Sequence, residues 1–240
     1  MPGHKTIQGY KINYERHLGQ GAYGIVWLCK KDSKKFAAKA VNFSPKKPDA
    51  YEAMKNGMEE LRQLQKYKHH HIVDMHDFMF EDGRLWYILE YCDRGNLSDY
   101  YTEVDPDDDA TICLMFQCAD AVNFMHKPPN IILHRDLKPK NILVKTYQDT
   151  VVIKVADFGF SRVVPDAPDI AHTFLFNTER GTAGYMAPEI FHKEKPYGAP
   201  VDIFSLGLVY AAMLNHKPGN RVIAPPDGNV YYFTSTVRCR

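Results

Sequence analysis

The segment from Ile131 to Gly159, IILHRDLKPKNILVKTYQDTVVIKVADFG, constrains the fold of this chain most strongly. Two short apolar runs, Ile142–Val144 and Val151–Ala156, lie on either side of a polar turn, a pattern that predicts two strands. A loop with Asp136 precedes the first run, and Asp157 follows the second. Acidic residues placed in loops beside two strands indicate a functional site rather than a core.

The residue types in these loops suit phosphate chemistry. Magnesium takes oxygen ligands, usually one or two from the protein together with phosphate and water. Asn141 and Asp157 are therefore predicted magnesium ligands on either side of a bound nucleotide, which leaves Asp136 to accept a proton. Lys138 would reach the transferring phosphate and stabilise its charge.

HRDLKPKN followed by DFG at this spacing resembles the catalytic loop and metal motif of eukaryotic protein kinases, and Lys138 resembles the Ser/Thr class. The resemblance implies ATP and Mg²⁺ as cofactors and protein serine or threonine hydroxyls as acceptors. The alternative is a charged loop and a turn without a function, but the matched positions together favour the kinase interpretation.

Composition narrows the remaining choices. The chain has 240 residues, 45% of them hydrophobic, and a net charge of +1, so charge does not indicate a nucleic-acid or membrane partner. The five cysteines form no CxxC pair, which favours a reducing compartment. The N-terminus lacks a signal-like apolar region, so we expect an intracellular protein, cytoplasmic or nuclear. The sequence does not predict an oligomeric state.

A glycine-rich segment, GQGAYGIV, follows an alternating run from Tyr10 to Leu18. Glycines let a backbone approach phosphates, although this pattern also occurs in dinucleotide-binding folds, where a helix follows the loop. Here a second strand-like run, Ile25–Cys29, follows instead, which favours the kinase interpretation. The resemblance implies nucleotide contacts from Leu18, Gly19, Gln20, Gly21, Ala22, Tyr23, Gly24, Ile25 and Val26.

Lys39, in the strand-like run FAAK, occupies the position of the kinase lysine that holds the α- and β-phosphates. Apolar residues repeat with a helical period over Asp49–Tyr67. Glu60 in that helix corresponds to the glutamate that pairs with the lysine. With the runs Ile72–Phe80 and Leu85–Glu90, we expect a first lobe of five strands and one helix.

Residues 90–93 resemble the kinase hinge. Adenine contacts are implied for Ala37, Leu89, Glu90, Cys92 and Leu143. Further along, GTAGYMAPE resembles the end of a kinase activation segment, and Arg135 resembles the arginine that binds a phosphothreonine there. Thr178 is the predicted phosphorylation site, with Thr173 as its rival.

Two helices are predicted in the second lobe, over about Ala110–His126 and over Pro200–Leu214. In the resemblance, Asp202 holds the backbone of the catalytic loop. After residue 214 prolines and glycines interrupt the pattern, so we expect the second lobe to be incomplete at its C-terminus.

We therefore expect an α+β, bilobal protein kinase fold over residues 10–240: a small antiparallel β lobe over 10–90, a hinge over 90–93 and a partial, mainly helical lobe over 94–240. The expected function is Mg-ATP-dependent phosphorylation of protein serine and threonine. The alternatives are a catalytically silent kinase-like module that binds nucleotide or acts as a scaffold, and a small-molecule kinase.

Overall fold

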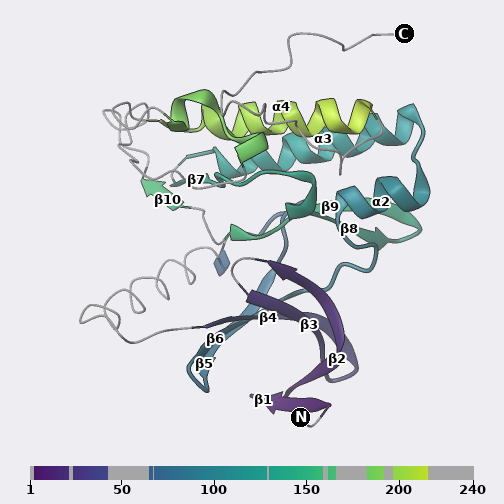
Figure 1. Ribbon diagram of the computed structural model, residues 1–240, viewed down its shortest axis with the longest axis vertical. Helices are drawn as coiled ribbons and strands as arrows, with labels where there is room; N and C mark the ends of the chain where they lie inside the picture. The colour runs from purple at the N-terminus through teal and green to yellow at the C-terminus, as the bar shows by residue number, and fades with distance from the viewer. Residues whose placement is uncertain are drawn as a thin grey trace. The chain divides into compact units, whose positions relative to one another are not determined.

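The computed structural model describes residues 3–21, 24–42, 65–66, 68–128, 130–158, 162–165, 183–191 and 197–215. The chain divides into two compact units, Met1–Asp93 and Arg94–Arg240 (Figure 1). Apart from residues 65 and 66, which are helical, the predicted helix over 49–67 lies outside the described residues. The predicted shortening of the second lobe concerns residues 216–240, which also lie outside them.

Unit 1 contains one curved antiparallel sheet (Figure 1). The strands described in it have the spatial order β1-β2-β3-β4-β6-β5. Their bounds are β1 His4–Ile7, β2 Tyr10–Gly21, β3 Gly24–Lys31, β4 Lys34–Asn42, β5 Met75–Glu81 and β6 Arg84–Glu90. The five strands predicted over residues 10–90 are found as β2 to β6, and β1, which was not predicted, precedes them.

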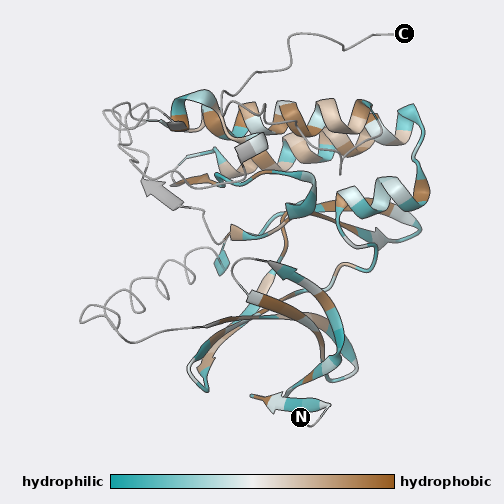
Figure 2. Cartoon of the chain, in the orientation of Figure 1, coloured by the Kyte–Doolittle hydropathy of each residue, from teal (hydrophilic) through white to brown (hydrophobic). Residues whose placement is uncertain are grey.

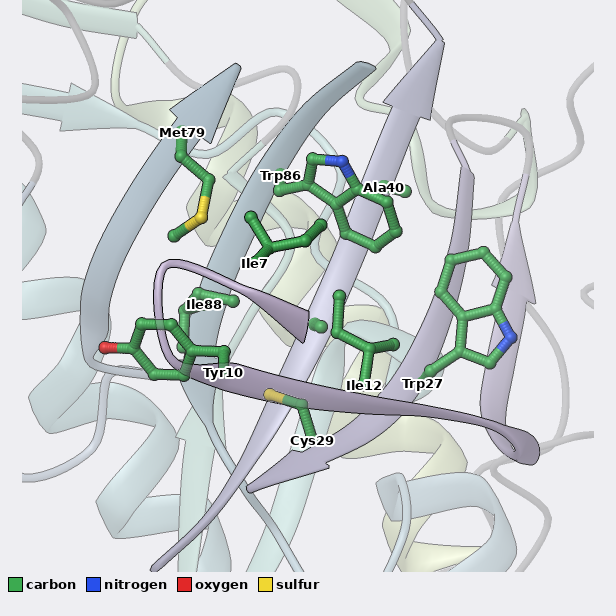
Figure 3. Packing of buried hydrophobic residues seen from close by; sticks show 10 residues of the cluster. Ile7, Tyr10, Ile12, Trp27, Cys29, Ala40, Met79, Trp86 and Ile88 are labelled. Carbon is green, nitrogen blue, oxygen red and sulfur yellow. The ribbon is translucent and has the colours of Figure 1, made fainter. Parts of the chain in front are cut away.

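The extra strand β1 completes the hydrophobic core of unit 1. Ile7 from β1 and Ile12 from β2 are buried against Trp86 and Ile88 of β6 (Figure 3). Alternate residues of a strand point to opposite faces of a sheet, so one face of each strand supplies the core. Phe36 packs on Tyr10 in an edge-to-face contact with 5.5 Å between ring centroids.

Two-residue turns join β1 to β2, β3 to β4 and β5 to β6. Asp82 and Gly83 form the turn between β5 and β6: Glu81 pairs with Arg84, and both turn residues have positive φ, 52° and 68°. Positive φ at both central positions fits the right-handed twist of the flanking strands.

Unit 2 is mainly helical, with α2 at Leu97–Val104, α3 at Asp108–Met125 and α4 at Pro200–Leu214. The side chain of Asp107 caps α3 by accepting a hydrogen bond from the amide of Ala110 at 2.8 Å. Acids in the first turn of α3 also complement the positive end of the helix dipole. The predicted bounds of α4 are confirmed, and those of α3 differ by one or two residues.

Two small antiparallel sheets accompany these helices. β8 at Ile142–Tyr147 pairs with β9 at Thr150–Val155, as the two apolar runs predicted. β7 at Asn130–Leu133 pairs with β10 at Arg162–Pro165, which the sequence did not indicate. The described part of unit 2 also contains 3₁₀ turns, among them η1 at Pro139–Asn141, η3 at Ala183–Tyr185 and η4 at Pro188–Phe191.

Helices α3 and α4 pack against each other and carry apolar residues along their length (Figure 2). Leu114, Val122 and Met125 of α3 are buried, as are Val209 and Met213 of α4. In the part of the chain that the structure describes, no helix combines the length and the apolar character that a membrane crossing requires.

Candidate active site

The loop between β7 and β8 carries the predicted catalytic residues, and it is unusually buried for a charged loop. His134 is inaccessible, and Arg135, Asp136 and Asn141 are 7%, 5% and 7% exposed. Charged groups are buried only where they gain partners, so the contacts of this loop determine its geometry.

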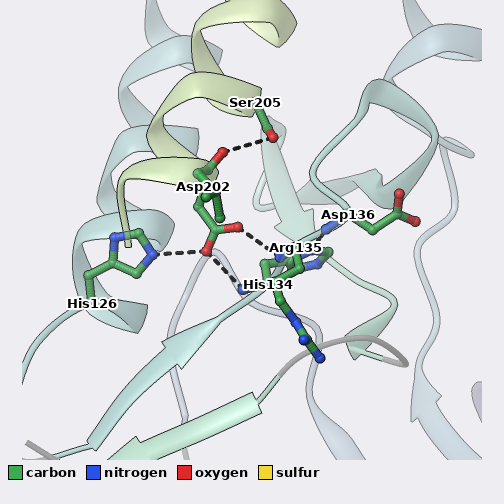
Figure 4. Close-up of polar contacts among 7 residues, drawn as sticks. His126, His134, Arg135, Asp136, Asp202 and Ser205 are labelled. Atoms are coloured by element: carbon green, nitrogen blue, oxygen red, sulfur yellow. Dashed lines mark hydrogen bonds and ion pairs between the residues drawn. The ribbon is translucent and has the colours of Figure 1, made fainter. Parts of the chain in front are cut away.

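Asp202 at the start of α4 holds the backbone of this loop (Figure 4). Its Oδ2 accepts a hydrogen bond from the amide of His134, and its Oδ1 accepts one from the amide of Arg135, both at 2.8 Å. His126, which follows the last residue of α3, donates from Nε2 to Oδ2 at 2.9 Å. One fully buried carboxylate therefore ties α3, α4 and the loop together.

The ring of His134 links the loop to the end of β9. The amide of Asp136 donates to Nδ1 at 3.3 Å, so the proton of the neutral ring lies on Nε2. Nε2 donates to the carbonyl of Ala156 at 2.9 Å, and the ring lies 5.1 Å from that of Phe158. His134 thus joins the loop of Asp136 to the segment that contains Asp157.

Three predicted site residues come together in this loop. Lys138 donates from Nζ to Oδ2 of Asp136 at 2.8 Å, and Asn141 donates from Nδ2 to the same oxygen at 2.8 Å. Nδ2 of Asn141 also donates to the backbone carbonyl of Asp136 at 2.8 Å. The carboxylate of Asp136 is therefore held in one orientation, with a positive charge beside it.

Asp157 follows β9, and its φ of 64° lies in the left-handed region. Arg135 has a φ of 65°. Non-glycine residues adopt this conformation uncommonly, and it occurs preferentially where the surrounding structure fixes a functional group. The amide of Ala156 donates to the carbonyl of Asn141 at 2.8 Å, which connects the two predicted metal-binding segments.

The donor set fits magnesium. Both hydrogen bonds from the Asn141 side chain use its nitrogen, which leaves Oδ1 as the atom suited to a cation, and Asp157 offers a carboxylate. Among the described residues no group of three or more His, Cys, Asp or Glu could hold a metal. Two oxygen ligands from the protein are typical of Mg²⁺ sites, in which phosphate and water complete the coordination shell.

In unit 1 the predicted phosphate loop joins β2 to β3, and Ala22 and Tyr23 at its tip lie outside the described residues. Leu18, Gly19, Gln20 and Gly21 end β2, and Gly24, Ile25 and Val26 begin β3. Gly24 has a φ of 145°, and a Cβ there would collide with the carbonyl oxygen of Ala40. A Cβ on Gly19 would meet nothing within 4 Å, so the structure of unit 1 itself does not require glycine there.

Lys39 and Ala37 lie in β4, where Lys39 pairs with Val26 of β3 and Tyr87 of β6. Glu60, the predicted partner of Lys39, lies outside the described residues. Leu89 and Glu90 end β6, and Cys92 follows. The amide of Glu90 donates to the carbonyl of Asp74 at 2.8 Å, so a bond from Glu90 to adenine would have to use its own carbonyl.

Leu143 lies in β8 of unit 2, opposite Asn96 in an isolated bridge. Thr173 and Thr178 lie outside the described residues. The segment after them is described from Ala183 to Phe191, and Ser205 of α4 donates to the carbonyl of Tyr185 at 2.7 Å.

Sequence reasoning missed two polar residues that bind the loop and strand of the site: Gln117 of α3, and His126, which caps the end of that helix. His126 was predicted only as the end of a helix, although its position eight residues before the HRD motif could have indicated a contact near the catalytic loop. The amide side chain of Gln117 binds the backbone of β9 at Val151 and Ile153. Nothing in the helical pattern distinguishes this glutamine from a surface residue.

Two buried thiols are poor candidates for chemistry. Burial raises the pKa of Cys29 to about 12 and that of Cys118 to about 12. Because a thiolate is the reactive form, these two residues behave as small core side chains at neutral pH.

Comparisons with known proteins agree with this geometry. The family model described as "Protein kinase domain" matches residues 12–222. The chain is 31% identical over 202 residues to the mouse protein named "Cyclin-dependent kinase-like 4", covering 84% of this chain and 56% of that protein.

Two further relatives are much longer than this chain. The Caenorhabditis briggsae protein named "Probable serine/threonine-protein kinase zyg-1" is 29% identical over 216 residues, covering 88% of this chain and 28% of that protein. The human protein named "Serine/threonine-protein kinase ULK1" is 29% identical over 237 residues, covering 96% and 22%. The chain thus spans about half or less of the length of these relatives. Since the family model matches most of the chain, the chain belongs to the protein kinase domain family.

Proposed function

We propose that the chain is a Ser/Thr protein kinase that transfers the γ-phosphoryl group of ATP to serine or threonine hydroxyls of proteins. The observation that carries the proposal is the group of Asp136, Lys138 and Asn141, joined by 2.8 Å hydrogen bonds on a loop that Asp202 fixes. A buried carboxylate oriented beside a lysine and an amide suits proton acceptance next to a transferring phosphate. The names of the relatives support the Ser/Thr class.

ATP and Mg²⁺ are the cofactors that the family implies. When bound, the metal would neutralise charge that develops on the phosphates. Asn141 and Asp157 would hold it. Lys39 would align the α- and β-phosphates, with Glu60 orienting the lysine, and the glycine segment 19–24 would cover them.

The chain's own residues then perform the transfer. Asp136 orients the acceptor hydroxyl and takes its proton as the oxygen forms a bond to the γ-phosphorus. The bond between that phosphorus and the bridging oxygen breaks, and ADP leaves. Lys138 stabilises the negative charge on the moving phosphoryl group. Because Asp202 fixes the amides of His134 and Arg135, the carboxylate of the neighbouring Asp136 needs little reorganisation during the reaction.

Protein substrates and ATP are the partners we propose, with one kinase domain over residues 10–240. Among the described residues Cys29, Cys113 and Cys118 are free thiols, which supports an intracellular location. Thr178, or Thr173 in its place, is the proposed activating phosphorylation site, with Arg135 as the partner of the phosphate.

Purified protein with Mg-ATP and a generic protein acceptor tests the proposal, beside Asp136→Asn and Asp157→Asn. We expect transfer by the natural chain and a loss of at least about 100-fold in both variants, since each removes a charge used in the transition state. Glu103→Gln, an exposed residue of α2, is the control for charge removal alone. Absence of transfer together with binding of Mg-ATP would overturn the proposal in favour of a silent nucleotide-binding module.

A further inference from the structure

The two-stranded sheet of β8 and β9 has two outer edges, and each edge is bonded in a different way. On the β8 side, Val144 bonds through its backbone to the backbone of Arg94 and Gly95, at 3.1 and 2.9 Å. On the β9 side the side chain of Gln117 from α3 binds the backbone of the strand. Because β9 leads directly to Asp157, this second edge bears on the proposed metal site.

The amide of Gln117 binds β9 as a neighbouring strand would. Its Oε1 accepts a hydrogen bond from the amide of Ile153 at 2.8 Å, and its Nε2 donates to the carbonyl of Val151 at 3.3 Å. In an antiparallel pair, backbone groups face the partner strand and the outer edge alternately. Val144 opposes Ile153 and turns its own groups outward, so Ile153 and Val151 also face outward, toward Gln117.

After Ile153, the end of β9 is held by the catalytic loop. The amide of Ala156 donates to the carbonyl of Asn141, and its carbonyl accepts from the ring of His134. Asp157 follows with its left-handed backbone. The strand is thus fixed by α3 at its start and by the catalytic loop at its end, and the position of Asp157 depends on both.

We propose that Gln117 is a positioning residue for the kinase reaction: it sets the course of β9 and thereby the place of Asp157 as a metal ligand. The inference rests on the proposed function for its catalytic consequence, but the structural part stands independently. Gln117 touches no reacting atom. A side chain without both a donor and an acceptor at this distance cannot make the two bonds.

The test compares Gln117→Met with Asn123→Met. Methionine keeps the length and the helix-forming character of glutamine and removes both bonds. Asn123 is an exposed amide on the same helix and serves as the matched control. A third variant, Gln117→Glu, keeps the acceptor for Ile153 but loses the donor for Val151.

The first measurement is amide hydrogen exchange of the protein without nucleotide. In Gln117→Met the amide of Ile153 should exchange roughly tenfold faster, the effect of losing one hydrogen bond, whereas Val152 and Lys154, which face β8, should keep their protection. The control should leave all three unchanged. Gln117→Glu should exchange at Ile153 more slowly than Gln117→Met.

The second measurement is steady-state phosphate transfer as a function of Mg²⁺ concentration. We expect Gln117→Met to need several-fold more Mg²⁺ for half-maximal rate, with the KM for the protein acceptor unchanged, because only the metal ligand is displaced. The inference is overturned if exchange at Ile153 stays at the natural rate, or if Val152, Ile153 and Lys154 all accelerate equally, which would indicate general destabilisation. If the natural chain transfers no phosphate, the proposed function fails while the exchange data still decide the role of Gln117.

Discussion

Asp202 shows how one residue can determine the geometry of a site that it does not enter. Its carboxylate accepts hydrogen bonds from His126, His134 and Arg135 and is completely buried. A buried acceptor that serves several donors cannot be replaced by a group that is itself partly a donor without leaving a polar atom unpaired.

Asp202→Asn should therefore lower the free energy of unfolding by about 1–3 kcal/mol, the usual cost of an unsatisfied buried group, and should also reduce phosphate transfer. Urea unfolding monitored by far-ultraviolet circular dichroism, which follows the helices of unit 2, measures the first effect. Glu103→Gln, on an exposed face, should change it by less than about 0.5 kcal/mol. Equal stability of Asp202→Asn and the natural chain would contradict the assigned role.

Tyr210 makes a second link between helices, donating from its hydroxyl to the carbonyl of Met115 at 2.5 Å. Burial, followed by the nearby Cys118, raises the pKa of Tyr210 from its ordinary 10.0 to about 12. A folded-state pKa above the unfolded value means that the protonated form stabilises the fold. This stabilisation is complete below pH 10 and is lost as pH rises toward 12.

Alkaline unfolding checks this expectation. The free energy of unfolding should fall between pH 10 and about 12, and the fall should be shallower in Tyr210→Phe, which cannot ionise. At neutral pH Tyr210→Phe should cost about 1 kcal/mol for the lost hydrogen bond. Parallel pH curves for the two proteins would show that Tyr210 does not contribute.

At the residue scale the sequence was most informative where chemistry restricts residue type. Asp136, Lys138 and Asn141 were predicted together because their types and spacing match the catalytic loop of protein kinases. In the structure Lys138 and Asn141 each donate a hydrogen bond of 2.8 Å to the carboxylate of Asp136. Gln117 was missed because a glutamine on a helix is usually solvated, and only the tertiary structure reveals that it faces a strand.

At the scale of elements, prediction succeeded where a pattern was long. The predicted and observed bounds of α4 agree because its fifteen residues are mostly apolar, and because the prolines and glycines that follow interrupt the helical pattern. The strands β1, β7 and β10 were missed, since each has four residues and a run of that length has no resolvable period. The pairing of β7 with β10 joins residues about thirty positions apart, which no local pattern encodes.

The strand β1 gives a test at this scale. Ile7 is 1% exposed in the core of unit 1, so Ile7→Ala should destabilise that unit by about 2–4 kcal/mol through lost apolar contact and the cavity left behind. Thr6→Ala, on an exposed position of the same strand, should have a small effect. Chemical unfolding followed through Trp27 and Trp86, the two tryptophans of the chain, reports directly on unit 1. Similar stability for the two variants would mean that β1 does not contribute to the core.

At the scale of the whole molecule, the chain forms two compact units that meet in sequence at Asp93 and Arg94. Of the predicted functional residues, Lys39 and the glycine segment lie in unit 1, and Asp136, Asn141 and Asp157 lie in unit 2. The family resemblance predicted this distribution, whereas the packing within each unit required the structure.

Mg-ATP, the proposed ligand, should stabilise the folded chain. With free Mg-ATP roughly 100-fold above its dissociation constant, the gain is about 2.7 kcal/mol, which raises the melting temperature. Differential scanning fluorimetry measures this shift. ATP with a chelator in place of Mg²⁺, and Asp157→Asn with Mg-ATP, should each give a smaller shift, and an equal shift in all three would contradict the assignment of Asp157 as a ligand.

The unequal burial of the cysteines opens the molecule to selective labelling. Cys29 and Cys118 are held as thiols in the core, whereas Cys113 is exposed and Cys92 is partly accessible. A maleimide dye at neutral pH should therefore modify Cys92 in unit 1 and Cys113 in unit 2 before the buried pair. Because Cys92 belongs to the proposed adenine contacts, Mg-ATP should slow its labelling and leave that of Cys113 unchanged, and mass spectrometry of the labelled peptides measures both rates.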